Sequence, residues 1–254
     1  SLRAIWKIVG LDDELCLVAT GGYGRAELFP QSDVDLLLLS DGPLSAEQTA
    51  RIEAMVGACW DVGLQIGHSV RSIDECLDEA RADITVQTSL LERRYLVGKR
   101  ASLDALSRRF DADMNPSQFF SSKLLEMRQR HSKFEDTPYS LEPNSKESPG
   151  GLRDLQVITW ISRAAGLGQT WAELFRHGLI TDTEMRQLRR NERILKRIRA
   201  CLHAVSGRRE DRLVFDLQAQ VAKALGYPAE DARRASEELM QHYYWAAKAV
   251  VQLN

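Results

Sequence analysis

Residues 21–35 read GGYGRAELFPQSDVD, and they follow a short apolar run at 15–19. The apolar run predicts a strand that the glycine pair ends. A second strand is expected over 33–39, where two carboxylates flank a valine and four leucines follow. Because alternate side chains of a strand point the same way, Asp33 and Asp35 are expected side by side on one face.

The two carboxylates predict a divalent cation site. Carboxylates that close repel each other unless a cation lies between them. Mg²⁺ prefers oxygen ligands and is usually held by one or two carboxylates together with substrate phosphates. Gly21 and Gly22 let the backbone approach phosphate oxygens without a Cβ clash, and a short helix expected over 25–28 offers its N-terminus to an anion. The residues therefore indicate a metal–nucleotide site with Asp33 and Asp35 as metal ligands.

The composition is that of an ordinary globular protein. The chain has 254 residues, enough for two domains, with 44% hydrophobic and 28% charged residues. A net charge of -2 argues against a general polyanion-binding surface, so no nucleic acid partner is expected. No apolar run approaches the ~20 residues that span a bilayer and no signal peptide is visible, so we expect no membrane partner and a cytoplasmic location. The abrupt start at Ser1 and end at Asn254 lead us to expect a piece of a longer chain.

The apolar periodicity divides the chain into two halves. Ser45 is expected to cap a helix that ends at Gly63, and a third strand is expected over 64–71. The spacing is helical after that strand, and a Pro/Gly/Ser-rich segment at 138–151 interrupts it. Helices are expected over 83–97, 117–134, 152–166, 183–206, 213–225 and 229–252. This predicts an α/β front half to about residue 115 and an all-helical back half.

The glycine pair, short helix and Asp-x-Asp strand resemble the signature of the nucleotidyltransferase superfamily of DNA polymerase β. Three longer stretches are similar, more specifically, to the bifunctional uridylyltransferase/uridylyl-removing enzymes that modify the nitrogen signal protein PII. They are GGYGRAELFPQSDVDLL at 21–37, GHSVR at 67–71 and LEPNSKESPGGLRDL at 141–155. The resemblance implies the fold class α/β (α+β). A polymerase β-like domain with a small mixed sheet is expected over 1–115, followed by an all-helical bundle domain over 116–254.

The resemblance also implies a reaction, the transfer of UMP from UTP to a tyrosine of PII with release of pyrophosphate. Asp33 and Asp35 would be catalytic and would hold a two-metal site with Mg²⁺, or Mn²⁺ in its place. Arg25 and Ser32 are expected to contact phosphates. UTP and PII are the partners that follow from this reading.

A third carboxylate, which the superfamily usually places on a later strand, is missing. The expected third strand contains no Asp or Glu, and His68 within it is more readily a structural residue. Asp61, Asp74 and Asp83 lie nearby, and the sequence does not choose among them.

The segment 141–155 offers a second group of charges. Lys146 and Arg153 lie beside a Pro-Gly-Gly turn and suit a phosphate or a nucleotide, while Asp154 suits a ribose contact or the orientation of Arg153. The same residues also suit a plain turn before a helix that begins near Gly151. We hypothesise that this loop packs over the active cleft.

Two alternatives remain open beside PII uridylylation. One is an adenylyltransferase acting on glutamine synthetase, a relative with a similar Pro-Gly-Gly-x-Arg-Asp block but with an Asp expected on its third strand. The other is a nucleotide-sensing module that binds without reaction. None of the five histidines is followed by Asp, so the uridylyl-removing activity is not expected of this chain. A Rossmann fingerprint fails at Glu27, and the chain has no P-loop motif.

Overall fold

The computed structural model describes residues 2–11, 15–227 and 231–253. Contacts between Cα atoms divide the chain into two compact units. Unit 1 is Ser1–Leu28 with Ser32–Met114, and unit 2 is Phe29–Gln31 with Asn115–Asn254. The nucleotidyltransferase role expected of residues 1–115 stays a prediction.

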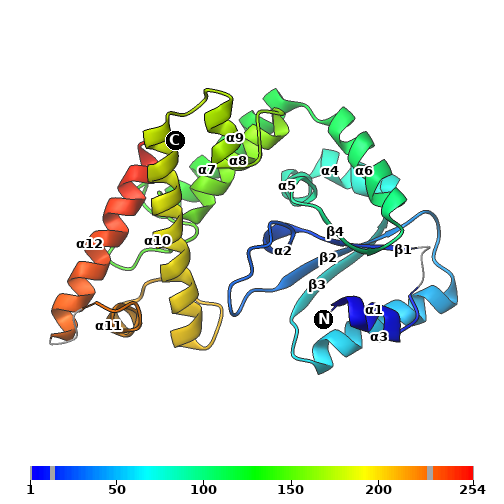
Figure 1. Cartoon of the computed structure of the whole chain (residues 1–254), viewed down its shortest axis with the longest axis horizontal. Coiled ribbons are helices and arrows are strands. Elements are labelled where there is room, and N and C mark those ends of the chain that lie inside the picture. The colour runs from blue at the N-terminus through cyan, green and yellow to red at the C-terminus, as the bar shows by residue number, and fades with distance from the viewer. Residues whose placement is uncertain (1, 12–14, 228–230, 254) are drawn as a thin grey trace. The chain divides into compact units, whose positions relative to one another are not determined.

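Unit 1 contains a four-stranded mixed sheet with the strand order β3-β2-β1-β4 (Figure 1). Its strands are β1 (Leu15–Ala19), β2 (Val34–Ser40), β3 (Ile66–Ser72) and β4 (Arg94–Gly98). β1 pairs antiparallel with both β2 and β4, whereas β2 and β3 are parallel. The small mixed sheet is therefore confirmed, and the three predicted strands match β1, β2 and β3 to within two residues at each end.

Helices cover both faces of this sheet, because its two central strands are apolar almost throughout. All residues of β1 are buried, and β2 exposes only Asp35. Leu17 and Leu36 face a core that they share with α1 and α3, while α4, α5 and α6 lie on the other side (Figure 1). The described helices of unit 1 are α1 (Leu2–Ile8), α2 (Gly21–Gly24), α3 (Ala46–Asp61), α4 (Ile73–Ala82), α5 (Ile84–Leu91) and α6 (Arg100–Asp113).

The cap of α3 is confirmed, since the Ser45 side chain accepts from the Gln48 amide. The helix expected over 83–97 is wrong in its second half. α5 ends at Leu91, and the chain then enters β4, whose backbone pairs with the open edge of β1. The local spacing also suits a helix, so the pairing with β1 decides the outcome.

The short helix expected over 25–28 is displaced towards the N-terminus. The helix found there, α2, is Gly21–Gly24, which is a single turn. Ala26 then adopts a φ of 61°, in the left-handed region, and this conformation does not continue a right-handed helix. The glycine pair therefore lies inside the turn rather than before it.

Unit 2 is all helical apart from an isolated bridge between Asn144 and Arg212, as far as the structure describes it. Its helices are α7 (Pro116–Ser132), α8 (Leu152–Ala164), α9 (Trp171–Arg176), α10 (Asp182–Ser206), α11 (Phe215–Ala224) and α12 (Ala232–Val251). The predicted all-helical half is confirmed, although α9 was not expected. The first two residues of the helix expected over 229–252 lie outside the described residues.

One apolar core holds these helices together. The α10 residues Leu188, Leu195, Ile198 and Leu202 are buried in it, together with residues of α8, α11 and α12. Fully burying one such side chain is worth about 1.5–3 kcal/mol, so the stripe explains why α10 keeps its place in spite of its many charges.

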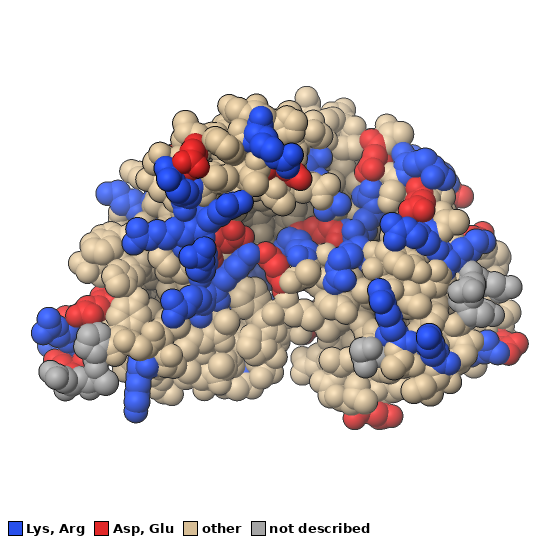
Figure 2. All heavy atoms as spheres, viewed as in Figure 1, with Lys and Arg blue, Asp and Glu red and all other residues tan. Residues whose placement is uncertain are grey.

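On the face shown in Figure 2, Lys and Arg side chains are more prominent than Asp and Glu side chains, and acidic side chains lie scattered among the basic ones. None of the helices within the described residues is both long enough and apolar enough to cross a bilayer.

Candidate functional site

The Asp35 carboxylate lies between two glycines of neighbouring elements. Asp35 is exposed although Val34 and Leu36 on either side of it are buried. The parallel ladder pairs Asp35 with Gly67 of β3. A Cβ added to Gly67 would lie 3.2 Å from Asp35 Oδ1, and one added to Gly21 would lie 2.6 Å from Oδ2. Both glycines therefore leave the space that the carboxylate fills.

The glycines of α2 are required by close backbone approaches. Gly21 has a φ of 55°, which side chains rarely adopt. A Cβ on Gly22 would lie 3.2 Å from the Glu27 carbonyl oxygen, and one on Gly24 would lie 2.0 Å from that of Glu92. Because α2 is a single turn, few peptide dipoles add up along it, and its contribution to an anion site rests on its amide groups.

Asp33 and Ser32 come directly before β2, and both are partly buried. The ladder already begins at this point, since the Val34 amide donates to the Gln65 carbonyl at 2.8 Å. Side chains alternate along extended backbone, so Asp33 falls on the side of Asp35. The structure thus brings Gly21 and Asp35 together and places Asp33 two residues before Asp35.

The donor chemistry of these residues fits Mg²⁺. Within the described residues, no group of three or more His, Cys, Asp or Glu forms a ligand cluster. Asp33 and Asp35 offer carboxylate oxygens, and the remaining ligands of Mg²⁺ are commonly water and substrate phosphates. A pair of carboxylates is enough for an ion that arrives with its nucleotide.

The residues of β3 do not supply the third carboxylate. The position beside Asp35 is Gly67. His68 pairs with Leu36 and shares its face of the sheet, which is opposite to the face of Asp35. The strand geometry therefore argues against a role for His68 beside the two aspartates.

The three nearby aspartates each have a place in a helix. Asp61 is the last residue of α3, and Asp74, in the first turn of α4, pairs with Arg109 at 2.6 Å. Asp83 caps α5 by accepting from the Thr85 amide at 2.6 Å. The contacts give Asp74 and Asp83 structural roles, and Asp61 is assigned none.

Arg25 is bound by two carboxylates of unit 1. Its Nε donates to Glu27 at 3.0 Å, and its Nη1 donates to Glu92. Burial lowers the pKa of Arg25, but Glu92 and Glu27 outweigh this effect and raise it overall. Nε and Nη1 are thus engaged with carboxylates of the same unit, and the phosphate contact expected of Arg25 stays a prediction.

Sequence reasoning missed Glu92, which is 4% exposed. It lies between α5 and β4, where a continuous helix was expected. Arg94 of β4 also contacts α2, since its Nε donates to the Gly24 carbonyl at 3.0 Å. Together Arg25, Glu92 and Arg94 fix the end of α2.

Lys146 and Arg153 of unit 2 share one carboxylate, that of Glu147. Arg153 Nη2 lies 3.1 Å from Glu147 Oε1, and Lys146 Nζ lies 3.5 Å from the same atom. Burial, followed by the charge of Arg153, lowers the pKa of Lys146. Two cations beside one carboxylate keep positive charge on this part of the loop, as a phosphate site needs.

Asp154 holds the loop together from inside. Its carboxylate is 0% exposed and accepts from the Gly150 amide at 2.7 Å, from Arg130 at 2.5 Å and from His131 at 2.9 Å. Burial works against its charge, but His131 and Arg130 outweigh burial and lower the pKa of Asp154. Arg153 is oriented by Glu147 and Gln156 instead. We therefore assign Asp154 to the framework of the loop rather than to a ribose contact.

The Pro-Gly-Gly turn has a packing reason of its own. Gly150 has a φ of 77°, and a Cβ there would lie 2.2 Å from the Ala247 carbonyl oxygen of α12. A Cβ on Gly151 would lie 2.7 Å from the Lys146 carbonyl oxygen. The predicted helix start is confirmed, since α8 begins at Leu152 with Gly151 as its N-cap. That this loop packs over the nucleotide site stays a prediction.

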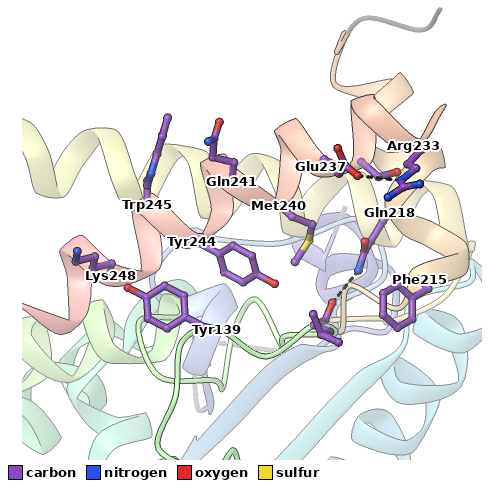
Figure 3. A pocket seen from close by; sticks show the side chains of 12 residues that line it. Tyr139, Phe215, Gln218, Arg233, Glu237, Met240, Gln241, Tyr244, Trp245 and Lys248 are labelled. Atoms are coloured by element: carbon purple, nitrogen blue, oxygen red, sulfur yellow. Dashed lines mark hydrogen bonds and ion pairs between the residues drawn. The ribbon is translucent and has the colours of Figure 1, made fainter. Parts of the chain in front are cut away.

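Two pockets in unit 2 contain none of the predicted site residues. One, of about 740 Å³, lies beside α12 and has an aromatic lining. Figure 3 shows the Tyr139 and Tyr244 rings close together in it, and their centroids are 5.7 Å apart. The Gln218 side-chain amide donates to the Leu141 carbonyl oxygen. The other, of about 870 Å³, is lined by residues of α10 and α12 and includes Trp245, which also lines the first. Cavity size alone does not locate the predicted chemistry.

Comparison with known proteins adds a family and several relatives. A family model described as GlnD PII-uridylyltransferase matches residues 118–254. Bifunctional uridylyltransferase/uridylyl-removing enzymes of Cupriavidus pinatubonensis and Cupriavidus metallidurans are 58% and 57% identical over 254 residues. That of Burkholderia mallei is 58% identical over 253 residues. All three matches cover 100% of this chain, which spans only 29–30% of the length of these relatives.

Proposed function

Because the chain belongs to the GlnD PII-uridylyltransferase family, we propose that it transfers UMP from UTP to a tyrosine hydroxyl of PII. The observation that carries the proposal is the exposed Asp35 carboxylate, which lies between Gly21 and Gly67, two residues after Asp33. The names of the relatives support uridylyl transfer as the reaction class.

The reaction is an in-line displacement at the α-phosphorus of UTP. The tyrosine oxygen forms a bond to phosphorus, the bond to the bridging oxygen of the β-phosphate breaks, and pyrophosphate leaves. The tyrosine proton passes to solvent or to a base, for which β3 offers no carboxylate. Positioning and charge stabilisation supply most of the rate in such transfers.

Asp33 and Asp35 would hold Mg²⁺, which when bound stabilises the attacking and leaving oxygens. Asp35 is suited to this task because the neighbouring residues Gly21 of α2 and Gly67 of β3 have no side chains, so a nucleotide phosphate can approach the carboxylate closely. The buried neighbours Val34 and Leu36 anchor β2 in the core and keep the carboxylate in place.

Gly21 and Gly22 would present amide groups to the triphosphate, since neither carries a side chain that blocks the approach. Ser32 would add a hydroxyl donor next to Asp33. Lys146 and Arg153 would contribute cations from the second motif, where their shared partner Glu147 keeps both side chains in fixed positions.

The test uses UTP labelled at the α-phosphorus, Mg²⁺ and purified PII. The wild-type chain should label PII, and Asp35→Asn or Asp33→Asn should reduce the transfer rate at least ~100-fold, because the loss of metal-borne charge stabilisation costs several kcal/mol. Asp78→Asn is the matched control, since Asp78 lies on the surface of α4 and pairs with Arg81.

The outcomes separate the alternatives. Label on PII that persists in Asp35→Asn would refute the assignment of the metal site. UTP uptake without transfer would identify a sensing module, and a preference for ATP would identify an adenylyltransferase. The glycine at position 67, beside Asp35, already departs from the Asp expected on the third strand of the adenylyl enzyme.

A further inference from the structure

The segment Phe29–Gln31 lies inside the signature motif but belongs to unit 2. Residues on both sides of it, up to Leu28 and from Ser32, belong to unit 1. Asp33 follows Gln31 by two residues, so their Cα atoms are at most ~7.6 Å apart. Whatever holds Gln31 in place therefore restricts where Asp33 can lie.

Two side chains of α10 hold this segment. The Arg199 guanidinium lies 4.1 Å from the centroid of the Phe29 ring, and the His203 ring lies 6.0 Å from it. The Gln31 amide donates to His203 Nδ1 at 3.4 Å. His203 is 0% exposed, so this histidine is part of the interior of unit 2.

Asp211 fixes both of these α10 side chains. Arg199 Nε donates to Asp211 Oδ1 at 2.6 Å, and His203 Nε2 lies 3.0 Å from the same oxygen. Because a backbone amide donates to Nδ1, that nitrogen carries no proton. The ring proton is therefore on Nε2, which donates a hydrogen bond to Asp211. Burial works against the charge of Asp211, but Arg199 outweighs burial and lowers its pKa. The carboxylate is therefore charged near neutral pH and fixes the tautomer of His203.

The same aspartate is joined to the second motif. Its carbonyl oxygen accepts from the Ser145 amide at 2.7 Å and from Ser145 Oγ at 3.0 Å. Ser145 precedes Lys146 directly. Asp211 thus lies between the loop that carries Lys146 and the helix that holds Phe29–Gln31.

We propose that Arg199, His203 and Asp211, here called the α10 clasp, are positioning residues for the catalytic carboxylates. The clasp holds Phe29–Gln31, and through this segment it sets the place of Asp33. The inference rests on the proposed UMP transfer, for which Asp33 must meet a metal ion. A misplacement of about 1 Å in such a site costs on the order of 100-fold in rate, so the clasp need not touch the substrate to matter.

Two substitutions of His203 separate its two hydrogen bonds. In His203→Gln the side-chain amide can replace Nε2 towards Asp211, but the acceptor for the Gln31 amide is lost. In His203→Asn the side-chain oxygen can replace Nδ1 and accept from Gln31. Leu188→Val is the control for lost stability, since it lies in the same core ~22 Å along α10 from His203.

The experiment measures kcat and KM for UTP, the melting temperature, and hydrogen exchange of the peptide that contains residues 29–33, all on the whole chain. His203→Gln should exchange faster in this peptide and lose at least tenfold in kcat, with KM for UTP within twofold of the wild type. His203→Asn should keep more of both exchange protection and kcat. Leu188→Val should lower the melting temperature without a change in this peptide.

Two results would overturn the positioning role. One is an unchanged kcat in His203→Gln while the wild type transfers UMP. The other is an equal loss of kcat in Leu188→Val at the same loss of melting temperature. A wild-type chain that transfers no UMP would instead refute the proposed function. Failure of the positioning role and failure of the proposed function are therefore distinguishable.

Discussion

Replacing Gly21 by alanine should damage catalysis far more than folding. The added Cβ would lie 2.6 Å from Asp35 Oδ2, whereas ordinary contacts begin at 3.4 Å, so the carboxylate must move by about 0.8 Å. It can do so cheaply, because Oδ2 is the end of a side chain. The cost in free energy of unfolding then comes mainly from the φ of 55°, about 1–2 kcal/mol for a residue with a Cβ.

A displacement of this size in a metal ligand is expected to cost on the order of 100-fold in kcat. Two further glycines turn the expectation into a graded series. Gly63 has a φ of 78° with open space around it, so Gly63→Ala has similar backbone strain and no clash. Gly67→Ala has no such strain, and its Cβ would lie 3.2 Å from Asp35 Oδ1, which requires a shift of only ~0.2 Å.

The assay compares the rate of UMP transfer to PII with the melting temperature for the three variants. Gly21→Ala should lose the most activity, Gly67→Ala an intermediate amount and Gly63→Ala little, while Gly21→Ala and Gly63→Ala lose similar stability. The reasoning is refuted if Gly21→Ala keeps the wild-type rate, or if Gly63→Ala loses activity to the same degree.

Two other predictions concern the second motif. Lys146→Ala should raise the half-saturation concentration of UTP about tenfold or more, because a hydrogen bond to a charged group is worth ~1.5–3 kcal/mol; Lys133→Ala, on the exposed end of α7, is the control, and equal kinetics for both would reject the contact. Asp154 has a lowered pKa in the folded state, so its stabilisation is complete above its unfolded pKa of about 3.9 and is lost as the pH falls through the folded value. Denaturant unfolding between pH 7 and pH 3 should therefore show a weaker pH dependence for Asp154→Asn, and an unchanged slope would contradict this account.

Much of the fold could be predicted from local pattern. The all-buried run of β1 and the nearly all-buried run of β2, broken at Asp35, indicate strands covered on both faces, and the apolar stripe of α10 repeats with the helical period. β4 was missed because its segment also suits a helix, and only hydrogen bonds to β1, far away in sequence, make it a strand. A rule based on short windows has no access to that pairing.

The candidate site also combines features that local sequence predicts with contacts that only the folded chain reveals. The spacing of Asp33 and Asp35 and the nearby glycines are visible in the sequence, but the partners of the charged residues are not. Arg25 meets Glu92 across 67 residues, and Gln31 meets His203 across 172. Sequence alone does not tell whether a charge such as that of Asp154 serves a ligand or an internal partner, because both uses need the same residue type.

The membership of Phe29–Gln31 in unit 2 bears on how this protein can be divided in the laboratory. A cut after Met114 would produce a helical piece without Phe29, whose ring stacks on Arg199. The other piece would keep the signature motif but lose the α10 side chains that contact it. Truncations designed on the apparent boundary should thus yield halves that are each incomplete. Mixing the two halves should restore more than either retains alone.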